Sequence, residues 1–148
     1  MFLKDDVFRK VIESTPLVSI DLIVRNVSGQ VLLGERNNSP AKGYWFVPGG
    51  RIYKNEKIAD ALQRISINEI GYPLSLENCT LKGVYEHFYD DGFYGESDST
   101  HYLALGFETS LSVEKLSLPF LQHNSYRFFS ELELSKSTEV HRFTKEYF

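Results

Sequence analysis

The sequence has little of several features that mark specialised classes of protein. Its 148 residues include one cysteine, Cys79, which excludes an internal disulfide and a cysteine-rich zinc site. No run of Lys and Arg exceeds two residues and the net charge is −4, so we expect no nucleic-acid surface. No apolar run approaches the roughly 18 residues of a membrane helix, so we expect no membrane partner. The first residues lack a cationic leader followed by an apolar stretch, so we expect a cytoplasmic protein without a signal peptide.

What is present suits one folded domain. Hydrophobic residues make up 42% of the chain and aromatic residues 14%, which is enough to fill a core. The length is typical of a single domain, so we expect residues 1–148 to form one unit.

Apolar periodicity and turn-forming residues predict strands interspersed with helices. The predicted strands are residues 17–25, 31–33, 44–47, 81–89, 101–108 and 126–129, and the predicted helices are residues 5–14, 56–70, 130–134 and 139–148. In the first strand, Val18, Ile20, Leu22 and Val24 are predicted to face one way. Strands predominate around one long central helix, which indicates an α+β or α/β sandwich.

The helix predicted at residues 56–70 has the clearest boundaries. Asn55 is a candidate N-cap, and Glu56 falls in the first turn, where negative charge is favourable. Gly71 is expected to end the helix in the left-handed conformation. The predicted buried stripe consists of Ile58, Ala61, Leu62 and Ile65.

Glycines and charged residues recur at fixed spacings in and around this helix. Gly50, Glu56, Arg64, Glu69 and Gly71 stand at the intervals of a known pattern, with Val47-Pro48 leading into it. The pattern resembles the Nudix box, a loop–helix–loop that holds Mg²⁺ against a diphosphate. The alternative is a tight turn before an ordinary amphipathic helix, with Glu69 as a solvated surface charge.

Two acidic positions of the box are not acidic here, because they carry Ile65 and Asn68. Positions 65, 68 and 69 share one side of a helix, so three carboxylates there would bind two or three Mg²⁺ ions. Glu69 alone anchors one ion at most and needs further oxygen ligands. A backbone carbonyl in the predicted turn at Gly49 and Gly50 is well placed to supply one.

The depleted box resembles one branch of the family, the GDP-mannose mannosyl hydrolases, which attack carbon rather than phosphorus. The likeness extends over nearly the whole chain through the strings at residues 14–19, 43–51, 87–91, 100–102 and 120–126. It implies an α+β fold with a mixed sheet between helices, a homodimer and a GDP-sugar substrate. It also implies one Mg²⁺ per site, with Mn²⁺ as a substitute.

The resemblance also implies metal ligands and a base. Gly49, Glu69 and Gln122 would hold the metal, and His123 would be the general base. Histidine suits proton removal near neutral pH, and a hydrolase without the usual box carboxylates needs a base elsewhere. An exposed loop histidine is the alternative for His123.

Three arginines take roles in the same comparison. Arg36 would stabilise the leaving diphosphate in a two-pronged contact, and Arg51 would neutralise phosphate. Arg64 would brace the box glutamates, with a solvated surface arginine as the alternative.

The remaining implied residues contact the sugar or the nucleotide. Asp21, His87 and Tyr102 correspond to polar residues near the sugar, and each is equally consistent with a buried structural role. The nucleotide contacts implied at the N-terminus are Phe2, Leu3 and Phe8, which otherwise suit helix docking.

These features predict Mg²⁺-dependent hydrolysis of GDP-mannose, or GDP-glucose, to GDP and the free sugar. Water would attack the anomeric carbon from the far face, which predicts inversion. One rival is a conventional Nudix pyrophosphatase that breaks the P–O–P bond. The other is a Nudix domain that binds a nucleotide sugar without catalysis.

Overall fold

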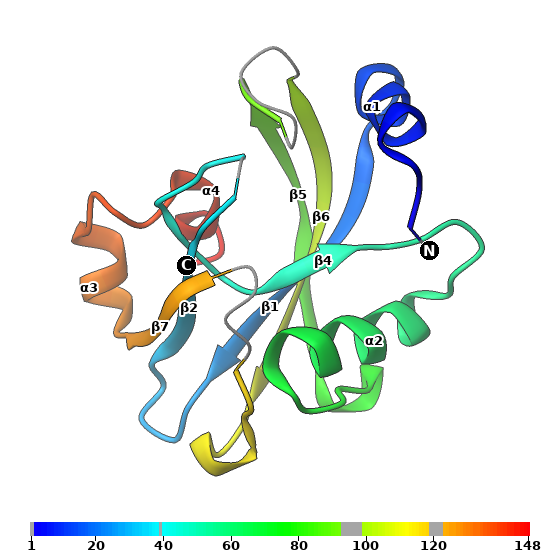
Figure 1. Cartoon of the computed structure of the whole chain (residues 1–148). Coiled ribbons are helices and arrows are strands. Elements are labelled where there is room, and N and C mark those ends of the chain that lie inside the picture. The colour runs from blue at the N-terminus through cyan, green and yellow to red at the C-terminus, as the bar shows by residue number, and fades with distance from the viewer. Residues whose placement is uncertain (1, 39, 93–98, 119–122) are drawn as a thin grey trace.

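A mixed sheet with helices on both sides organises the protein (Figure 1). The computed structural model describes residues 2–38, 40–92, 99–118 and 123–148, with only the backbone of residues 123 and 124. Its strands are β1 (Leu17–Arg25), β2 (Val31–Arg36), β3 (Trp45–Phe46), β4 (Gly49–Arg51), β5 (Thr80–Tyr89), β6 (Thr100–Ser110) and β7 (His123–Phe129). Its helices are α1 (Asp5–Ser14), α2 (Ile58–Ile70), α3 (Glu131–Lys136) and α4 (Arg142–Lys145), with 3-10 turns η1 (Leu76–Asn78) and η2 (Val113–Lys115).

The sheet order is β3-β2-β1-β6-β5, with β4 added to β1 and β7 added to β2. Strands β1 and β6 are parallel, in register from Leu17 opposite Tyr102 to Arg25 opposite Ser110, and the other pairs are antiparallel. The predicted α+β architecture with a mixed sheet is therefore confirmed. The bounds of α1 and β1 agree with the sequence prediction, whereas α4 is much shorter than the helix predicted at residues 139–148.

The predicted turn at Gly49 and Gly50 is wrong. Both residues belong to β4, which pairs antiparallel with β1 so that Asp21 lies opposite Gly49 and Ile20 opposite Gly50. Gly49 allows close approach of β4 to β1, and Gly50 allows close approach of β4 to Ile65 of α2, so neither glycine serves a change of chain direction. Their place beside β1 sets the geometry of the site described below.

Helix α2 begins two residues later than predicted. Its N-cap is Lys57, without a side-chain cap, whereas Asn55 has a positive φ of 66° and is not the cap. Glu56 therefore precedes the helix rather than lying in its first turn. Gly71 ends α2 as predicted, with φ 69°, and its N–H donates to the Ile67 carbonyl.

Strand β1 is buried on both faces, because helices cover the sheet on each side (Figure 1). One apolar cluster lies under α2 and consists of Ile20, Leu22, Val24, Leu32, Ala61, Leu62, Ile65, Ile70, Leu74 and Phe107. The second lies on the side of α3 and consists of Ile23, Val31, Leu33, Val47, Phe129, Leu134, Val140 and Tyr147. Ile58 was predicted to be buried but is 45% exposed, because it lies at the start of α2. Val18, predicted to share a face with Ile20, Leu22 and Val24, is 40% exposed near the start of β1.

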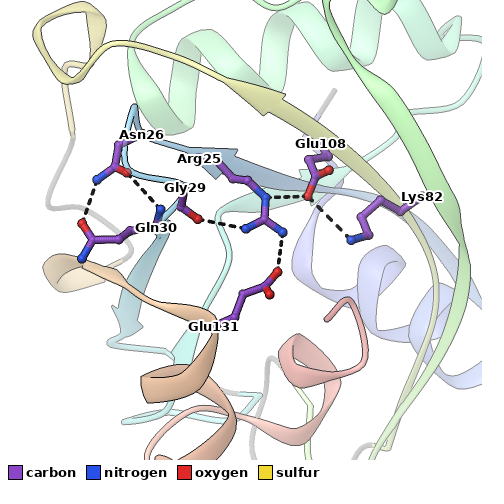
Figure 2. A network of polar contacts seen from close by, with 7 residues as sticks. All are labelled: Arg25, Asn26, Gly29, Gln30, Lys82, Glu108 and Glu131. Carbon is purple, nitrogen blue, oxygen red and sulfur yellow. Dashed lines mark hydrogen bonds and ion pairs between the residues drawn. The ribbon is translucent and has the colours of Figure 1, made fainter.

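An ion network centred on Arg25 fastens the far end of β1 (Figure 2). The Arg25 guanidinium contacts the Glu108 carboxylate at 2.9 Å and the Glu131 carboxylate at 2.7 Å, and it donates to the Gly29 carbonyl. Lys82 lies 3.6 Å from the same Glu108 carboxylate. The network joins β1, β5, β6 and α3. It lies at the C-terminal end of β1, four residues after Asp21. In the described part of the chain, no helix is long and apolar enough to cross a membrane.

Candidate active site

Asp21 and Gly49 lie directly opposite each other on β1 and β4. A β-carbon at Gly49 would stand 2.5 Å from the Asp21 Oδ1 atom and 2.5 Å from the Ile20 carbonyl oxygen. Only glycine fits at position 49 without movement of the backbone. The pairing of β1 and β4 thus places the Asp21 Oδ1 atom close to the backbone of Gly49.

Glu69 is the carboxylate that α2 contributes to this region. It is 5% exposed, and burial raises its pKa to about 7, with Arg36 lowering it and Asp21 raising it. Ile65, one turn earlier, is buried against Gly50, where a β-carbon would lie 3.1 Å from Ile65 Cγ1. Asn68 is exposed. The side chains at 65 and 68 therefore occupy a packing position and a solvent position.

Arg36, at the end of β2, supplies positive charge to the site. It is partly buried, and it lowers the pKa of both Asp21 and Glu69, so it lies within electrostatic range of the two carboxyl groups. Its Nε atom is 3.4 Å from the Asn38 carbonyl oxygen, and its guanidinium carbon is 5.8 Å from the centre of the Phe46 ring. The guanidinium can therefore act between the carboxylates and an anionic ligand.

Asp21 carries a second contact that the sequence did not indicate. Burial raises its pKa to about 6, while a hydrogen bond from Tyr147 and the charge of Arg36 lower it. The Tyr147 hydroxyl donates to Asp21 Oδ2 over 2.5 Å. Tyr147 stands 126 positions further along the chain, and no motif links the two residues.

Tyrosines line the surroundings of these charges. Burial raises the pKa of Tyr102 and of Tyr89, and both lie within electrostatic range of Arg36 and Asp21. Their rings meet edge to face at 6.3 Å. Tyr126, on β7, has its pKa raised to about 12 by burial and by Glu69. The predicted sugar contact Tyr102 thus lies with Asp21 and Arg36, and Tyr89 and Tyr126 join them without a sequence signal.

Arg64 braces the loop that precedes α2. Its guanidinium donates to both oxygens of Glu56, at 2.7 and 2.9 Å, and to the Arg51 carbonyl at 2.8 Å. The hydrogen bonds from Arg64 lower the pKa of Glu56 to about 2. The Tyr53 ring lies 3.8 Å from the Arg64 guanidinium carbon. Arg64 therefore holds β4 and the box loop in place, and this geometry agrees with the predicted bracing.

The N-terminal segment approaches the site through Arg51. The Arg51 guanidinium carbon lies 4.9 Å from the Phe8 ring, and Arg51 is within electrostatic range of Tyr102. Leu3 is partly buried, but Phe2 is 97% exposed and belongs to no described contact. Of the predicted nucleotide contacts, Phe8 thus lies beside Arg51.

His87 is placed behind the site. It is 4% exposed and its ring stacks on Phe143 at 4.6 Å with an angle of 6°. Burial lowers its pKa to about 4, and its Nε2 atom has no hydrogen-bond partner among the described residues. The centre of the Tyr147 ring lies 6.1 Å from that of the His87 ring, and the Tyr147 hydroxyl contacts Asp21, so Tyr147 links His87 to Asp21.

Two predicted residues come from β7 and the chain before it. Gln122 lies outside the described residues. The backbone of His123 begins β7 and pairs opposite Arg36, although its side chain is not described. A base at His123 and the cation at Arg36 would thus start from adjacent backbone positions.

The oxygen donors suit a hard divalent cation. No three His, Cys, Asp or Glu side chains come together to hold a metal ion in the part of the chain that is described. A site here therefore needs oxygens beyond carboxylates, such as the Gly49 carbonyl and the predicted ligand Gln122. Burial disfavours the anion of Glu69, and a cation beside it would restore that charged form. Among the described residues, the Glu69 carboxylate and the Gly49 carbonyl are thus oxygen donors of the kind that a hard divalent cation takes.

Comparisons with known proteins identify the family of the chain and support its fold. The NUDIX domain family matches residues 15–148. The low-salt glycan biosynthesis protein Agl8 of Haloferax volcanii is 43% identical over 125 residues, which cover 84% of this chain and 78% of that protein. The fold is similar to a MutT NUDIX hydrolase from Burkholderia pseudomallei (TM-score 0.73, 21% identity, 90% of this chain and 96% of that chain). It is also similar to a MutT protein from Methanosarcina mazei Go1 (TM-score 0.72, 17% identity, 90% and 91%). Enzymes of the NUDIX type generally use divalent metal ions, and this chain belongs to that family of hydrolases, which act on nucleotide-derived substrates.

Proposed function

We propose that this protein hydrolyses GDP-mannose to GDP and free mannose in a Mg²⁺-dependent reaction. Water attacks the anomeric carbon of the sugar, the C–O bond to the diphosphate breaks, and the configuration inverts. GDP-glucose is the second substrate that we propose. The family supports hydrolysis of a nucleotide derivative, and the choice of sugar and of bond is our proposal.

The observation that carries the proposal is the single carboxylate on the site face of α2. Glu69 is buried beside Asp21 and Arg36, whereas Ile65 is packed into the core and Asn68 is exposed. Direct attack on phosphorus in the full box relies on three carboxylates on this helix. Their reduction to one favours reaction at a centre beyond the diphosphate.

Different residues act on the diphosphate and on the sugar of the substrate. Arg36 offsets negative charge on the departing GDP, because a guanidinium can donate two parallel hydrogen bonds to phosphate oxygens. Glu69, the Gly49 carbonyl and Gln122 would hold Mg²⁺, which would supply further positive charge for the diphosphate. Asp21 and Tyr102 face the sugar, and His123 accepts the proton of the attacking water.

The relative from Haloferax volcanii supports a sugar-containing substrate. The name of that protein places it in glycan biosynthesis, and the two chains share 43% identity over 125 residues. A substrate that carries a sugar on a nucleotide is consistent with both the family and that name.

One assay tests the proposal against its rivals. The protein is incubated with GDP-mannose and Mg²⁺, and the products GDP and GMP are resolved by chromatography. We expect GDP and mannose, with activity lost in Glu69→Gln and kept in the control Glu77→Gln, which alters an exposed carboxylate in η1. GMP with mannose 1-phosphate would instead identify a pyrophosphatase. Binding without turnover of any GDP-sugar would identify a non-catalytic domain.

A further inference from the structure

Tyr147 reaches the site from the C-terminal part of the chain, far in sequence from the box. It follows α4 and is 2% exposed, and its backbone N–H donates to the Thr144 carbonyl at 3.2 Å. Its hydroxyl donates to Asp21 Oδ2 over 2.5 Å. A buried tyrosine thus connects the C-terminal helix to the carboxylate at the centre of β1.

The sheet makes room for this ring. A β-carbon at Gly106 would lie 2.7 Å from Tyr147 Cε1 and 3.1 Å from Cδ1, so the absent side chain is what allows the ring to pack there. Tyr85 meets the ring edge to face at 4.5 Å, and His87 lies 6.1 Å away. Because the ring is enclosed on several sides, the hydroxyl has a fixed position.

The two oxygens of Asp21 have different neighbours. Oδ2 accepts the hydrogen bond from Tyr147, whereas Oδ1 faces Gly49, at 2.5 Å from where a β-carbon would stand. A carboxylate with one oxygen held in this way cannot rotate freely about its last bond. Its other oxygen is therefore presented toward Gly49 on β4.

We propose that Tyr147 is a positioning residue that fixes the Asp21 carboxylate in the orientation used at the substrate. This inference rests on the proposed function to the extent that Asp21 faces the sugar there. Tyr147 itself acts through Asp21, and its hydroxyl makes no contact with the substrate.

A purely structural role for the ring makes a different prediction, and Tyr147→Phe separates the two. This variant keeps the ring against Gly106 and removes only the hydroxyl. We expect kcat to fall about tenfold, which is the lower end of what a hydrogen bond to a charged group contributes. KM should change less than kcat, and the melting temperature should fall by no more than about 5 °C. The matched control is Tyr85→Phe, which removes a hydroxyl from the same aromatic group and should keep wild-type kcat.

A double-mutant cycle shows whether Tyr147 acts through Asp21. Tyr147→Phe is measured alone and in the Asp21→Asn background. We expect its effect on kcat to be much smaller in that background, because residues that act as one unit are not additive. Equal effects in both backgrounds, or an unchanged kcat in Tyr147→Phe alone, would overturn the inference.

A second variant tests the position of the ring through kcat, and a binding measurement tests the inference without turnover. Gly106→Ala should displace the Tyr147 ring and lower kcat as well, without altering either partner of the hydrogen bond. Calorimetry with Ca²⁺ in place of Mg²⁺ then compares GDP-mannose with GDP. In Tyr147→Phe we expect weaker binding of GDP-mannose and unchanged binding of GDP. Equal changes for both ligands would contradict a role for Tyr147 on the sugar side.

Failure of the proposed function gives a different pattern. If wild-type protein released GMP from GDP-mannose, the choice of bond would be wrong, and the cycle of Tyr147 and Asp21 would be measured on that reaction. If wild-type protein turned over no GDP-sugar, the calorimetric comparison would decide the inference. GDP release by wild type with no effect of Tyr147→Phe would overturn the Tyr147 inference alone.

Discussion

Gly49 lies so close to Asp21 that a β-carbon on the glycine would stand 2.5 Å from the Asp21 Oδ1 atom. The contact follows from the antiparallel pairing of β4 with β1, in which these two residues are direct partners. It brings the backbone of the box and a carboxylate of the central strand to one place. The second glycine, Gly50, faces the other way and packs on Ile65 of α2.

Gly49→Ala should abolish most of the activity. The added carbon would collide with a backbone oxygen of Ile20 as well as with Asp21, so the two strands must separate. We expect kcat/KM to fall by more than about 100-fold, as a displacement of about 1 Å in a site can cause. Gly50→Ala is the comparison, because its nearest neighbour is the flexible Ile65 side chain at 3.1 Å and a smaller loss should follow. Equal activity in the two variants would contradict the importance of the contact between Gly49 and Asp21.

Glu69→Gln should weaken Mg²⁺ activation and reduce turnover. The substitution keeps the size of the side chain but removes the one box carboxylate on the site face of α2, and a neutral amide is a poorer ligand for a hard cation. The measurement is turnover as a function of Mg²⁺ concentration. An unchanged half-saturating concentration together with an unchanged maximal rate would show that Glu69 does not hold the metal.

Restoring the box carboxylates should not create a good pyrophosphatase. Ile65 is 2% exposed in the core, so Ile65→Glu buries a charge and should cost several kcal/mol of stability. Asn68→Glu alone should fold normally, because position 68 is exposed. We expect the double variant to be less stable in urea and to release GDP as its main product. GMP as the main product would mean that the carboxylates alone decide which bond breaks.

The sequence predicted the fold better than the site because the fold depends on local patterns. Alternating apolar residues set the bounds of β1, and the Gly71 signal gave the end of α2. The predicted N-cap Asn55 is wrong, because its residue type suits a cap but its φ of 66° places it in the left-handed region before the helix. The turn predicted at Gly49 and Gly50 is wrong, because the pairing of these residues with β1 does not follow from the local sequence.

The site depends on contacts between residues far apart in the chain. The box spacing located Glu69 and the bracing pair of Arg64 and Glu56, which are neighbours on one loop and helix. Tyr147 and Asp21 are 126 positions apart and join only through the packing of the C-terminal helix on the sheet. The placement of Gln122 and of the His123 side chain stays a prediction.

Acid should destabilise the protein through His87. Its pKa is lowered from 6.5 to about 4 by burial, so the unfolded chain binds a proton that the folded chain refuses. The stability is present above pH 6.5 and is lost as the pH falls toward 4. The maximal loss from this group is about 3 kcal/mol. Glu146 Oε2 lies 3.8 Å from His87 Nε2, but its carboxylate is about half exposed to solvent, which screens its charge.

Urea denaturation at pH 7.5, 5.5 and 4.5 measures this loss. His87→Phe keeps a ring to stack on Phe143 and removes the titrating group, so its unfolding free energy should fall less between pH 7.5 and 4.5. The same pH dependence in the variant and the wild type would assign the acid sensitivity to other groups.

The bond that breaks can be identified by reaction in ¹⁸O-water. Attack at carbon places the label on C1 of mannose and none in GDP, whereas attack at phosphorus places it in a phosphate oxygen. GDP is the decisive product, because free mannose also exchanges its C1 oxygen with water and needs a control incubation without enzyme. Proton NMR during the reaction should show β-mannose first, as inversion requires.

His123→Ala should slow the reaction by roughly 10²–10⁴-fold, the usual contribution of a positioned general base. The acidic fall of the wild-type rate, which reflects protonation of a histidine base, should be absent in this variant. Label in a phosphate oxygen would end the carbon-attack proposal even if His123→Ala were inactive, because that residue could then serve as the base for attack at phosphorus.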